Sequence, residues 1–209
     1  MAEPKLEDSR QFGPVSVRLV QEDIAAVQAD VLVNAANTQL HMGGGVAAAL
    51  RSRGGIEIHQ EAIHQAPAAL GNVVRTGAGK LDARYVYHAV VIDYDVSKGT
   101  SASDVATAMK NVLRQASSDA VKSLGLPLFG AGVGGLSVES SLETILDEID
   151  RASRGFPGQL EITIAVRDSE EFERARVSFR GYSDRDARKK EESDLASDFL
   201  NELLKKRKE

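Results

Sequence analysis

The sequence predicts an α/β fold: a three-layer α/β/α sandwich around a mixed, largely parallel central sheet. Short apolar segments with strand-forming residues alternate along the chain with longer segments of helical periodicity, which is the pattern of a sheet covered by helices on both faces. In two places, residues 31–46 and 126–136, an apolar run passes through glycines directly into a helical pattern. The chain of 209 residues is long enough for one such domain with tails, or for two very small domains.

Six strands are expected from runs of apolar and β-branched residues bounded by turn residues. The first and the last alternate apolar and polar side chains, whereas the second is mostly apolar, as in a strand covered on both faces. In chain order the expected strands are residues 15–20, 31–36, 73–76, 85–92, 124–129 and 160–166.

Five helices are expected from apolar residues at helical spacing. Ser101 or Ser103, Ser137 and Ser169 precede three of them, where a hydroxyl oxygen can accept a hydrogen bond from the first N–H groups. Pro67 is expected to end the second helix. In chain order the helices are expected over residues 46–54, 56–66, 102–123, 138–149 and 170–179.

The two ends of the chain differ in composition from the middle. Residues 1–13 are expected to be a polar lead-in, residues 14–180 the folded domain, and residues 181–209 a charged C-terminal helix or tail. The last segment is rich in Asp, Glu, Lys and Arg and keeps its few apolar residues at helical spacing. It is expected either to lie as a solvated helix against its own domain or to bind a partner.

Composition and charge narrow the classes of function. The formal net charge is −5, so we expect no general electrostatic binding to nucleic acid or to an anionic membrane. The sequence contains no cysteine, which excludes a disulfide framework and a thiolate zinc site, and we expect no metal and no cofactor. The polar N-terminus has no signal-peptide core and no apolar stretch is long enough to cross a bilayer, so a cytoplasmic location is expected.

The two glycine-rich segments give the clearest indication of function. Glycine tolerates positive φ and lets backbone N–H groups approach a ligand closely, and the N-terminus of the helix that follows adds partial positive charge. These features favour an anion, most commonly phosphate, and two such segments indicate an extended phosphate held from both sides. Neither segment has the Gly-x-x-x-x-Gly-Lys-Ser/Thr pattern, and residues 130–135 match a dinucleotide fingerprint only loosely.

Five short motifs carry a more specific signal than the glycines alone. In chain order they are Glu22-Asp-Ile24, Val33-Asn-Ala-Ala-Asn37, Met42-Gly-Gly-Gly-Val46, Tyr85-Val-Tyr-His88 and Pro127-Leu-Phe-Gly-Ala-Gly-Val133. Together they resemble the macrodomain (Appr-1''-p processing) family, whose members bind ADP-ribose. The resemblance covers residues 15–179, the size of one such domain. The spacing between the second and third motifs is its most specific part.

The resemblance implies a role for each matching residue. The Asp23 carboxylate would accept a hydrogen bond from the adenine amine, with the Ile24 N–H at a ring nitrogen, and Asn37 would bind hydroxyls of the distal ribose. Residue chemistry also allows Asp23 to cap a turn and Asn37 to satisfy loop backbone, while Asn34 is expected to pin the loop. The expected ligand-binding residues are Asp23, Ile24, Asn37, Gly43, Gly44, Gly45, Val46, Gly130, Ala131, Gly132, Val133, Gly134 and Arg167.

Two positions depart from the family pattern. Many members carry an aromatic residue against the distal ribose where this chain has Gly134, so this wall is expected to be missing or to come from elsewhere, with Phe129 as the candidate. Members also often place an aromatic residue over the adenine, where this chain has Arg167. A guanidinium can stack on adenine, and an ordinary exposed arginine is the equal alternative.

The resemblance leaves hydrolysis and recognition open. An acidic residue used by one hydrolase branch is replaced by Ala47, and the first loop has no lysine. Substrate-assisted hydrolysis of mono-ADP-ribosyl carboxylate esters or related ADP-ribose derivatives is then expected, with Asn37, Gly45 and His41 nearest the chemistry. The alternatives are a non-catalytic ADP-ribose reader and, for His41, a solvent-facing loop residue. An oxidoreductase is disfavoured because no acidic ribose ligand is suitably placed. His88, inside a strand, is expected to be a hydrogen-bonded core histidine.

Overall fold

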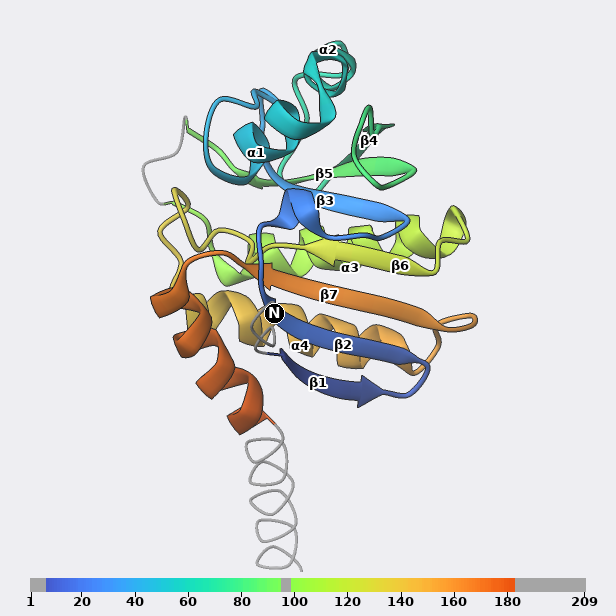
Figure 1. Cartoon of the computed structure of the whole chain (residues 1–209), viewed down its shortest axis with the longest axis vertical. Coiled ribbons are helices and arrows are strands. Elements are labelled where there is room, and N and C mark those ends of the chain that lie inside the picture. Colours follow the sequence, from blue (N-terminus) through green and yellow to red (C-terminus); the bar gives the residue numbers. More distant parts are fainter. Residues whose placement is uncertain (1–6, 95–98, 183–209) are drawn as a thin grey trace, which may run out of the picture.

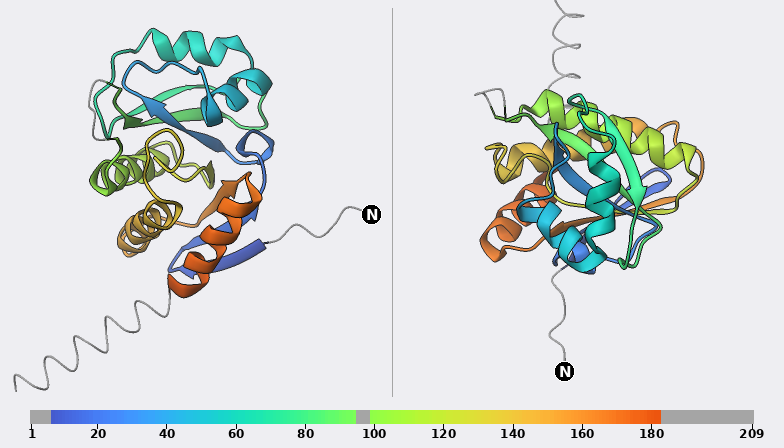
Figure 2. Two further views of the ribbon diagram at one scale, coloured as in Figure 1. Left: turned by 90° about the vertical axis from the view of Figure 1, so that its left-hand side faces the viewer. Right: turned by 90° about the horizontal axis from the view of Figure 1, so that it is seen from above.

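The computed structural model describes residues 7–94 and 99–182, in which one seven-stranded sheet is covered by helices on both faces (Figures 1 and 2). In chain order the elements are β1 (Glu7–Phe12), β2 (Val15–Gln21), the 3-10 helix η1 (Ile24–Ala26), β3 (Val31–Asn37), α1 (Gly45–Gly54), α2 (Ile56–Ile63), β4 (Val73–Gly77), β5 (Tyr85–Ile92), α3 (Ala102–Ser118), β6 (Ser123–Leu126), α4 (Val138–Ser153) and β7 (Leu160–Val166). A further helix covers residues 169–182. The expected α/β fold with a mixed, largely parallel sheet is confirmed.

The order of the strands places the loops that matter for function. It is β1-β2-β7-β6-β3-β5-β4, in which the five central strands run parallel and the edge strands β1 and β4 are antiparallel to their neighbours. The carboxyl ends of the central strands therefore share one edge of the sheet, on the left in Figure 1. β3 and β6 pair only through Val31 with Leu124 and Leu32 with Gly125. Their carboxyl halves are consequently not hydrogen-bonded to each other.

Side chains on the two faces of the sheet enter different clusters. Tyr87 of β5 and Val33 of β3 face the larger cluster, which is covered by α3, α4 and the helix over residues 169–182. Leu32 and Val86 face the opposite way, into a cluster with η1, α1 and α2. This alternation is the period of two that a strand imposes on its side chains, and it produces the three layers seen in Figure 2.

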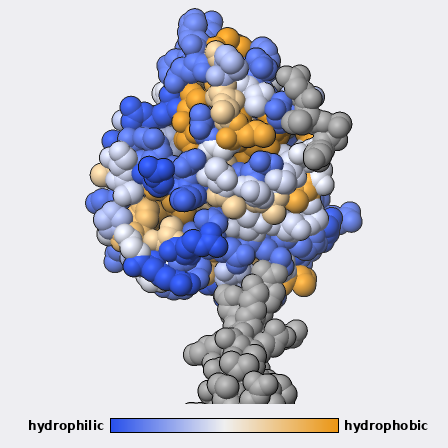
Figure 3. All heavy atoms as spheres, turned by 180° about the vertical axis from the view of Figure 1, so that it is seen from behind, coloured by the Kyte–Doolittle hydropathy of each residue, from blue (hydrophilic) through white to orange (hydrophobic). Residues whose placement is uncertain are grey.

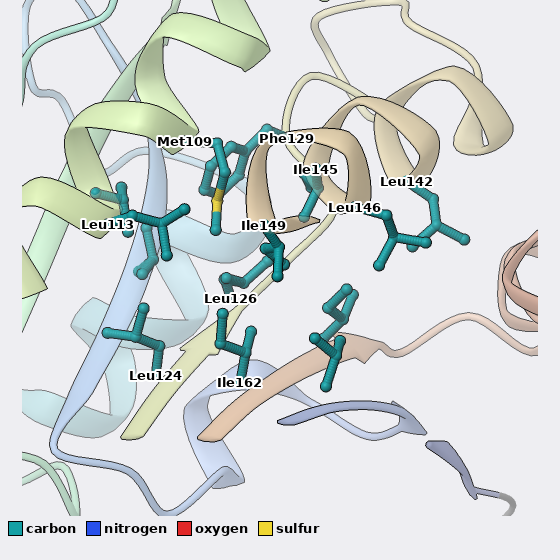
Figure 4. Close-up of a cluster of buried hydrophobic side chains, with 14 of the residues drawn as sticks. Met109, Leu113, Leu124, Leu126, Phe129, Leu142, Ile145, Leu146, Ile149 and Ile162 are labelled. Atoms are coloured by element: carbon teal, nitrogen blue, oxygen red, sulfur yellow. The ribbon is translucent and has the colours of Figure 1, made fainter. Parts of the chain in front are cut away.

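The larger cluster is the main core of the domain. Figure 4 shows Met109 and Leu113 of α3 facing Ile145 and Ile149 of α4 above the sheet residue Leu126. These side chains are buried. Complete burial of such a side chain contributes about 1.5–3 kcal/mol, so this cluster holds α3 and α4 firmly on the sheet.

The expectation of a polar lead-in over residues 1–13 is wrong for residues 7–12, which form β1 and pair along their whole length with β2. The strand is held by backbone hydrogen bonds and by few side chains. Phe12 packs edge-on against Tyr182, with ring centroids 5.9 Å apart, and Asp8 forms an ion pair with Arg180 at 2.9 Å. Polar and charged side chains suit a sheet edge because they discourage pairing with another chain.

Helix ends also differ from expectation. α3 ends at Ser118, short of residue 123, and Ala120 then adopts a φ of 49° as the chain turns toward β6. The final helix is capped by Asp168 and not by Ser169, because the Asp168 carboxylate accepts the second and third N–H groups that follow it at 3.0 and 2.9 Å.

The described residues contain no helix that is both long and apolar enough to cross a membrane. The described part of the last helix reaches residue 182, past the expected domain boundary at 180. Residues 1–6 and 183–209, and with them the two roles considered for the charged C-terminal segment, lie outside the described residues.

Candidate functional site

The expected ligand-binding residues lie in loops at the shared carboxyl edge of the parallel strands. Asp23 follows β2, Arg167 follows β7, and the two glycine-rich segments follow β3 and β6. In open α/β sheets, ligands bind outside the carboxyl ends of the strands, where neighbouring strands part. β3 and β6 part from each other at their carboxyl ends and so mark this place in the sheet.

Asp23 and Arg167 form one end of this region. One oxygen of Asp23, Oδ1, accepts the N–H of Ala25 at 2.9 Å and caps η1, which is the structural role that residue chemistry allowed. The other, Oδ2, lies 4.0 Å from Nη1 of Arg167, which is itself 77% exposed. The Ile24 side chain is buried, so only its backbone is available to a ligand. This end therefore presents one carboxylate oxygen and one exposed guanidinium to solvent.

Asn37 organises the loop after β3. Its Nδ2 donates to the carbonyl oxygen of His41 at 2.9 Å, and its Oδ1 accepts the N–H groups of Gln39 and His41, each at 3.1 Å. Asn37 is the last residue of β3, and the register of β3 with β5 shifts between Ala36 and Asn37. Asn37 is 6% exposed, so its amide serves the loop backbone first.

The expectation that Asn34 pins this loop is wrong. Its side chain points into the sheet face, where Nδ2 lies 3.1 Å from Nδ1 of His88. The other ring nitrogen of His88 lies 3.1 Å from the Thr76 hydroxyl, so the histidine is a hydrogen-bonded core residue as expected. Burial, with a smaller contribution from His59, lowers the pKa of His88 to about 4. Asn34, His88 and Thr76 are thus part of the framework behind the site.

The N-terminus of α1 is open. Its cap residue is Gly44, with no side-chain cap, whereas Ser101 and Ser137 cap α3 and α4. Gly45 has a φ of 53°, which favours glycine. Nothing lies within 4 Å of the position that a Cβ would take at Gly43, Gly44 or Gly45. The first N–H groups of a helix have no partner inside it, and no side chain caps this helix, so those of residues 45–47 are available to an anion.

The second glycine segment divides into packed and open residues. A Cβ at Gly134 would lie 2.4 Å from Thr100 Oγ1 and 2.7 Å from the Gly130 carbonyl oxygen, and one at Gly130 would lie 2.6 Å from Thr100 Cγ2. These two glycines are therefore required by packing. By contrast, Gly132 faces open space and Val133 is 77% exposed. Among the described residues, the N–H groups of residues 131–134 have no acceptor.

The missing aromatic wall has a structural cause, because Thr100 and Gly130 leave no room for a side chain at Gly134. The suggestion that Phe129 replaces this wall is wrong. Phe129 is fully buried in the main core beside Met109 (Figure 4). The part of the second segment that a ligand can reach is thus the backbone around Gly132 and the side chain of Val133.

His41 is exposed on the first loop, as the alternative for this residue expected. Its ring centroid lies 6.1 Å from that of His59 on α2. Burial, then the charges of Arg51 and His41, lower the pKa of His59. No group of three His, Asp or Glu side chains that could hold a metal ion occurs within residues 7–94 and 99–182.

Comparison with known proteins identifies the family. A family model described as Macro domain matches residues 33–145, more than half of the chain. The chain belongs to the macrodomain family. An uncharacterized protein of Mycobacterium tuberculosis is 34% identical over 161 residues, which cover 77% of this macrodomain chain and 44% of the relative. An uncharacterized protein of Aquifex aeolicus is 36% identical over 157 residues, covering 75% and 93%. The chain thus spans less than half the length of its mycobacterial relative.

Solved macrodomain structures share the fold. The Oceanobacillus iheyensis macrodomain with ADP has a TM-score of 0.79 at 18% identity, over 88% of this chain and all (100%) of that one. The Trypanosoma brucei macrodomain in complex with ADP-ribose has a TM-score of 0.69 at 23% identity, over 76% of this chain and 67% of that one. This likeness confirms the macrodomain fold of the chain.

Two contacts at the edge of this macrodomain were not anticipated from sequence. Thr100 fixes the second segment, since its N–H donates to the Gly134 carbonyl at 2.8 Å and its hydroxyl to the Val91 carbonyl at 2.6 Å. His59 lies beside His41 although 18 positions separate them in sequence. Both contacts join segments far apart in sequence, and no local pattern marks either of them.

Proposed function

We propose that this macrodomain binds ADP-ribose at the carboxyl edge of its sheet and hydrolyses mono-ADP-ribosyl esters of carboxylates. The observation that carries the proposal is the glycine-lined N-terminus of α1, which has no side-chain cap and has open space around Gly43, Gly44 and Gly45. It is supported by membership of the family and by solved macrodomains that hold ADP or ADP-ribose.

In the proposed complex the diphosphate lies between the two glycine-rich segments. It receives N–H groups from the start of α1 on one side and from residues 131–134 on the other. The adenine lies toward Asp23 and Arg167, where the exposed Oδ2 of Asp23 accepts the exocyclic amine and the guanidinium stacks on the ring. The distal ribose lies toward the loop that Asn37 and His41 hold.

The proposed reaction needs little from the protein beyond position. A water held by the diphosphate attacks the anomeric carbon of the distal ribose, and its proton passes through a diphosphate oxygen to solvent. The bond from that carbon to the ester oxygen breaks, and the carboxylate leaves with the bonding pair. A carboxylate has a pKa near 4 in water, so its departure requires no general acid. This suits a loop whose nearest titratable side chain is His41. Asn37 acts by holding that loop, and backbone N–H groups stabilise charge as it develops.

A non-catalytic reader is the second candidate, and the hydrogen bonds of Asn37 favour it. The side-chain oxygen and one amide hydrogen of Asn37 already serve the backbone of Gln39 and His41. A site in which the Asn37 amide is engaged in this way can hold ADP-ribose without activating water.

Two measurements test the proposal. Calorimetry with ADP-ribose should show saturable binding, and no heat at millimolar ligand would reject both the hydrolase and the reader. Time-resolved release of ADP-ribose is then followed from proteins modified on Glu or Asp and from proteins modified on Ser. We expect release from the carboxylate ester alone. Binding of ADP-ribose without its release from either modified protein would support the non-catalytic reader and reject the hydrolase.

A further inference from the structure

A groove lies between the C-terminal halves of α3 and α4, on the side of the domain shown in Figure 3. Its volume is about 480 Å³, within the range of about 300–1,000 Å³ of small-molecule sites. One wall comes from α3 and the other from α4 and the turn after it. The lining residues are Lys110, Leu113, Arg114, Ser117, Ser118, Glu148, Arg151, Ala152, Gly155, Phe156 and Pro157.

Small residues line part of the groove on both walls. Ser117 and Ser118 lie on the last turn of α3, Ala152 lies on the last turn of α4, and Gly155 lies just after α4. The floor is apolar, with Leu113 buried and Phe156 partly buried against the main core. Hydrophobic atoms recessed between hydrophilic ones are visible on the left side of Figure 3.

Cations form the rim of the groove. Lys110 and Arg114 are exposed on α3, and Arg151 on α4 forms an ion pair with the buried carboxylate of Glu148. Lys110 has no ionic partner among the described residues. Cations often stabilise the end of a helix, but that effect is confined to the last turn, and the last turn of α3 has no basic residue. The helix dipole therefore does not explain Lys110 and Arg114.

We propose that this groove binds a small amphipathic carboxylate, whose apolar body lies on Leu113, Ala152 and Phe156 and whose charge faces Lys110 and Arg114. The apolar floor favours a ligand with an apolar part. Lys110 and Arg114 favour a negatively charged head group, although the chain as a whole has a net charge of −5.

The site is independent of ADP-ribose. α3 begins beside the carboxyl edge of the sheet and ends at the opposite edge (Figure 1). None of the groove-lining residues belongs to the loops after β2, β3, β6 or β7. Occupation of the groove and occupation of the carboxyl edge are therefore separable.

The full chain is titrated with the apolar anionic dye anilinonaphthalene sulfonate, whose fluorescence rises on transfer to an apolar site. Decanoate should displace the dye, and decyltrimethylammonium, with the same chain and the opposite charge, should not. The double variant Lys110→Glu/Arg114→Glu should bind the dye at least tenfold more weakly, whereas the matched variant Lys80→Glu should bind as the wild type does. Ala152→Leu, which fills the groove without changing charge, should also weaken binding.

ADP-ribose calorimetry on each variant shows whether it is folded, because none of these residues touches the proposed ADP-ribose site. Equal dye affinity in the wild type and the charge-reversed variant would overturn the proposal. So would equal displacement by the two decyl compounds. Displacement of the dye by an acidic peptide, with no displacement by decanoate, would indicate that the groove binds a protein partner. This result would also overturn the proposal.

Discussion

Asn37 holds both backbone polar groups of His41: its Nδ2 donates to the His41 carbonyl at 2.9 Å, and its Oδ1 accepts the His41 N–H at 3.1 Å. The two residues are four positions apart in sequence, so a single amide closes the loop between β3 and the glycines of α1. The shape of the first glycine segment depends on this closure. Asn37 is thus a positioning residue, whatever else it contacts in a complex.

Replacement of Asn37 by Ala should affect stability and binding together. The variant loses three hydrogen bonds, each worth about 1 kcal/mol, so the free energy of unfolding should fall by about 2–3 kcal/mol and ADP-ribose affinity at least tenfold. Denaturant unfolding and calorimetry measure the two effects. Gln39→Ala, at an exposed position in the same loop, should change neither. A fully stable Asn37→Ala protein that loses only turnover would show that the amide acts on substrate.

Asp23→Asn should separate the two tasks of Asp23. An asparagine oxygen can still cap Ala25, but an NH₂ group then stands where the second carboxylate oxygen would accept the adenine amine. We expect unchanged stability, about tenfold weaker ADP-ribose binding, and unchanged binding of ribose 5-phosphate, all by calorimetry. Asp23→Ala should in addition lose about 1 kcal/mol of stability. Equal weakening for both ligands would place adenine elsewhere.

Gly134→Ala and Gly132→Ala form a matched pair in the second segment. The first places a Cβ 2.4 Å from Thr100 Oγ1, with the Gly130 carbonyl equally in the way, and should cost about 1–3 kcal/mol of stability. The second enters open space and should be close to neutral. Thermal unfolding of the two variants distinguishes them. Equal stability would mean that the second segment relaxes freely and that Thr100 does not shape it.

His88 should make the domain less stable in mild acid. Its pKa is lowered to about 4 by burial in the folded protein, against about 6.5 in an unfolded chain. Between these values the unfolded state binds the extra proton, so stability is complete above pH 6.5 and declines as pH falls toward 4. The full effect is about 3 kcal/mol.

Unfolding free energies of wild type and His88→Gln at a series of pH values isolate this contribution, because other titrating groups are common to both proteins. The two curves should diverge from pH 4 to 6.5 and run parallel above it. Direct titration of the His88 ring by NMR gives the same information without a variant. A ring that titrates near pH 6.5 would contradict the account.

Local patterns predicted those parts of the fold that local interactions determine. The apolar run of β3, the serine caps of α3 and α4, and the alternation of β7 all depend on residues close together in sequence. β1 was missed because the strand Glu7–Phe12 has little apolar alternation and is held by backbone pairing with β2 and by contacts to the C-terminal helix.

The sequence predicted which glycine-rich loops form the candidate site, but it predicted the directions of the neighbouring side chains less well. Asn34 was expected to hold the loop, but its side chain pairs with the buried His88, and Asn37 holds the loop instead, which was the alternative considered for it. The pairing of Asn34 with a residue 54 positions away has no local signal in the sequence. Phe129 was expected in a ligand wall because it directly precedes the second glycine segment. Its position in sequence does not reveal the direction of its ring, which points into the core. The role of Thr100 depends on a contact between two loops and was likewise beyond the sequence.

The location of ADP-ribose is the central claim, and an amide-resolved NMR titration of the full chain tests it most directly. We predict saturable shifts of the signals from residues 43–47 and 131–134 and from Ile24, with the signals of residues 110–118 in the α3–α4 groove unchanged. Saturable shifts confined to other surfaces, or no shifts at millimolar ADP-ribose, would contradict the account.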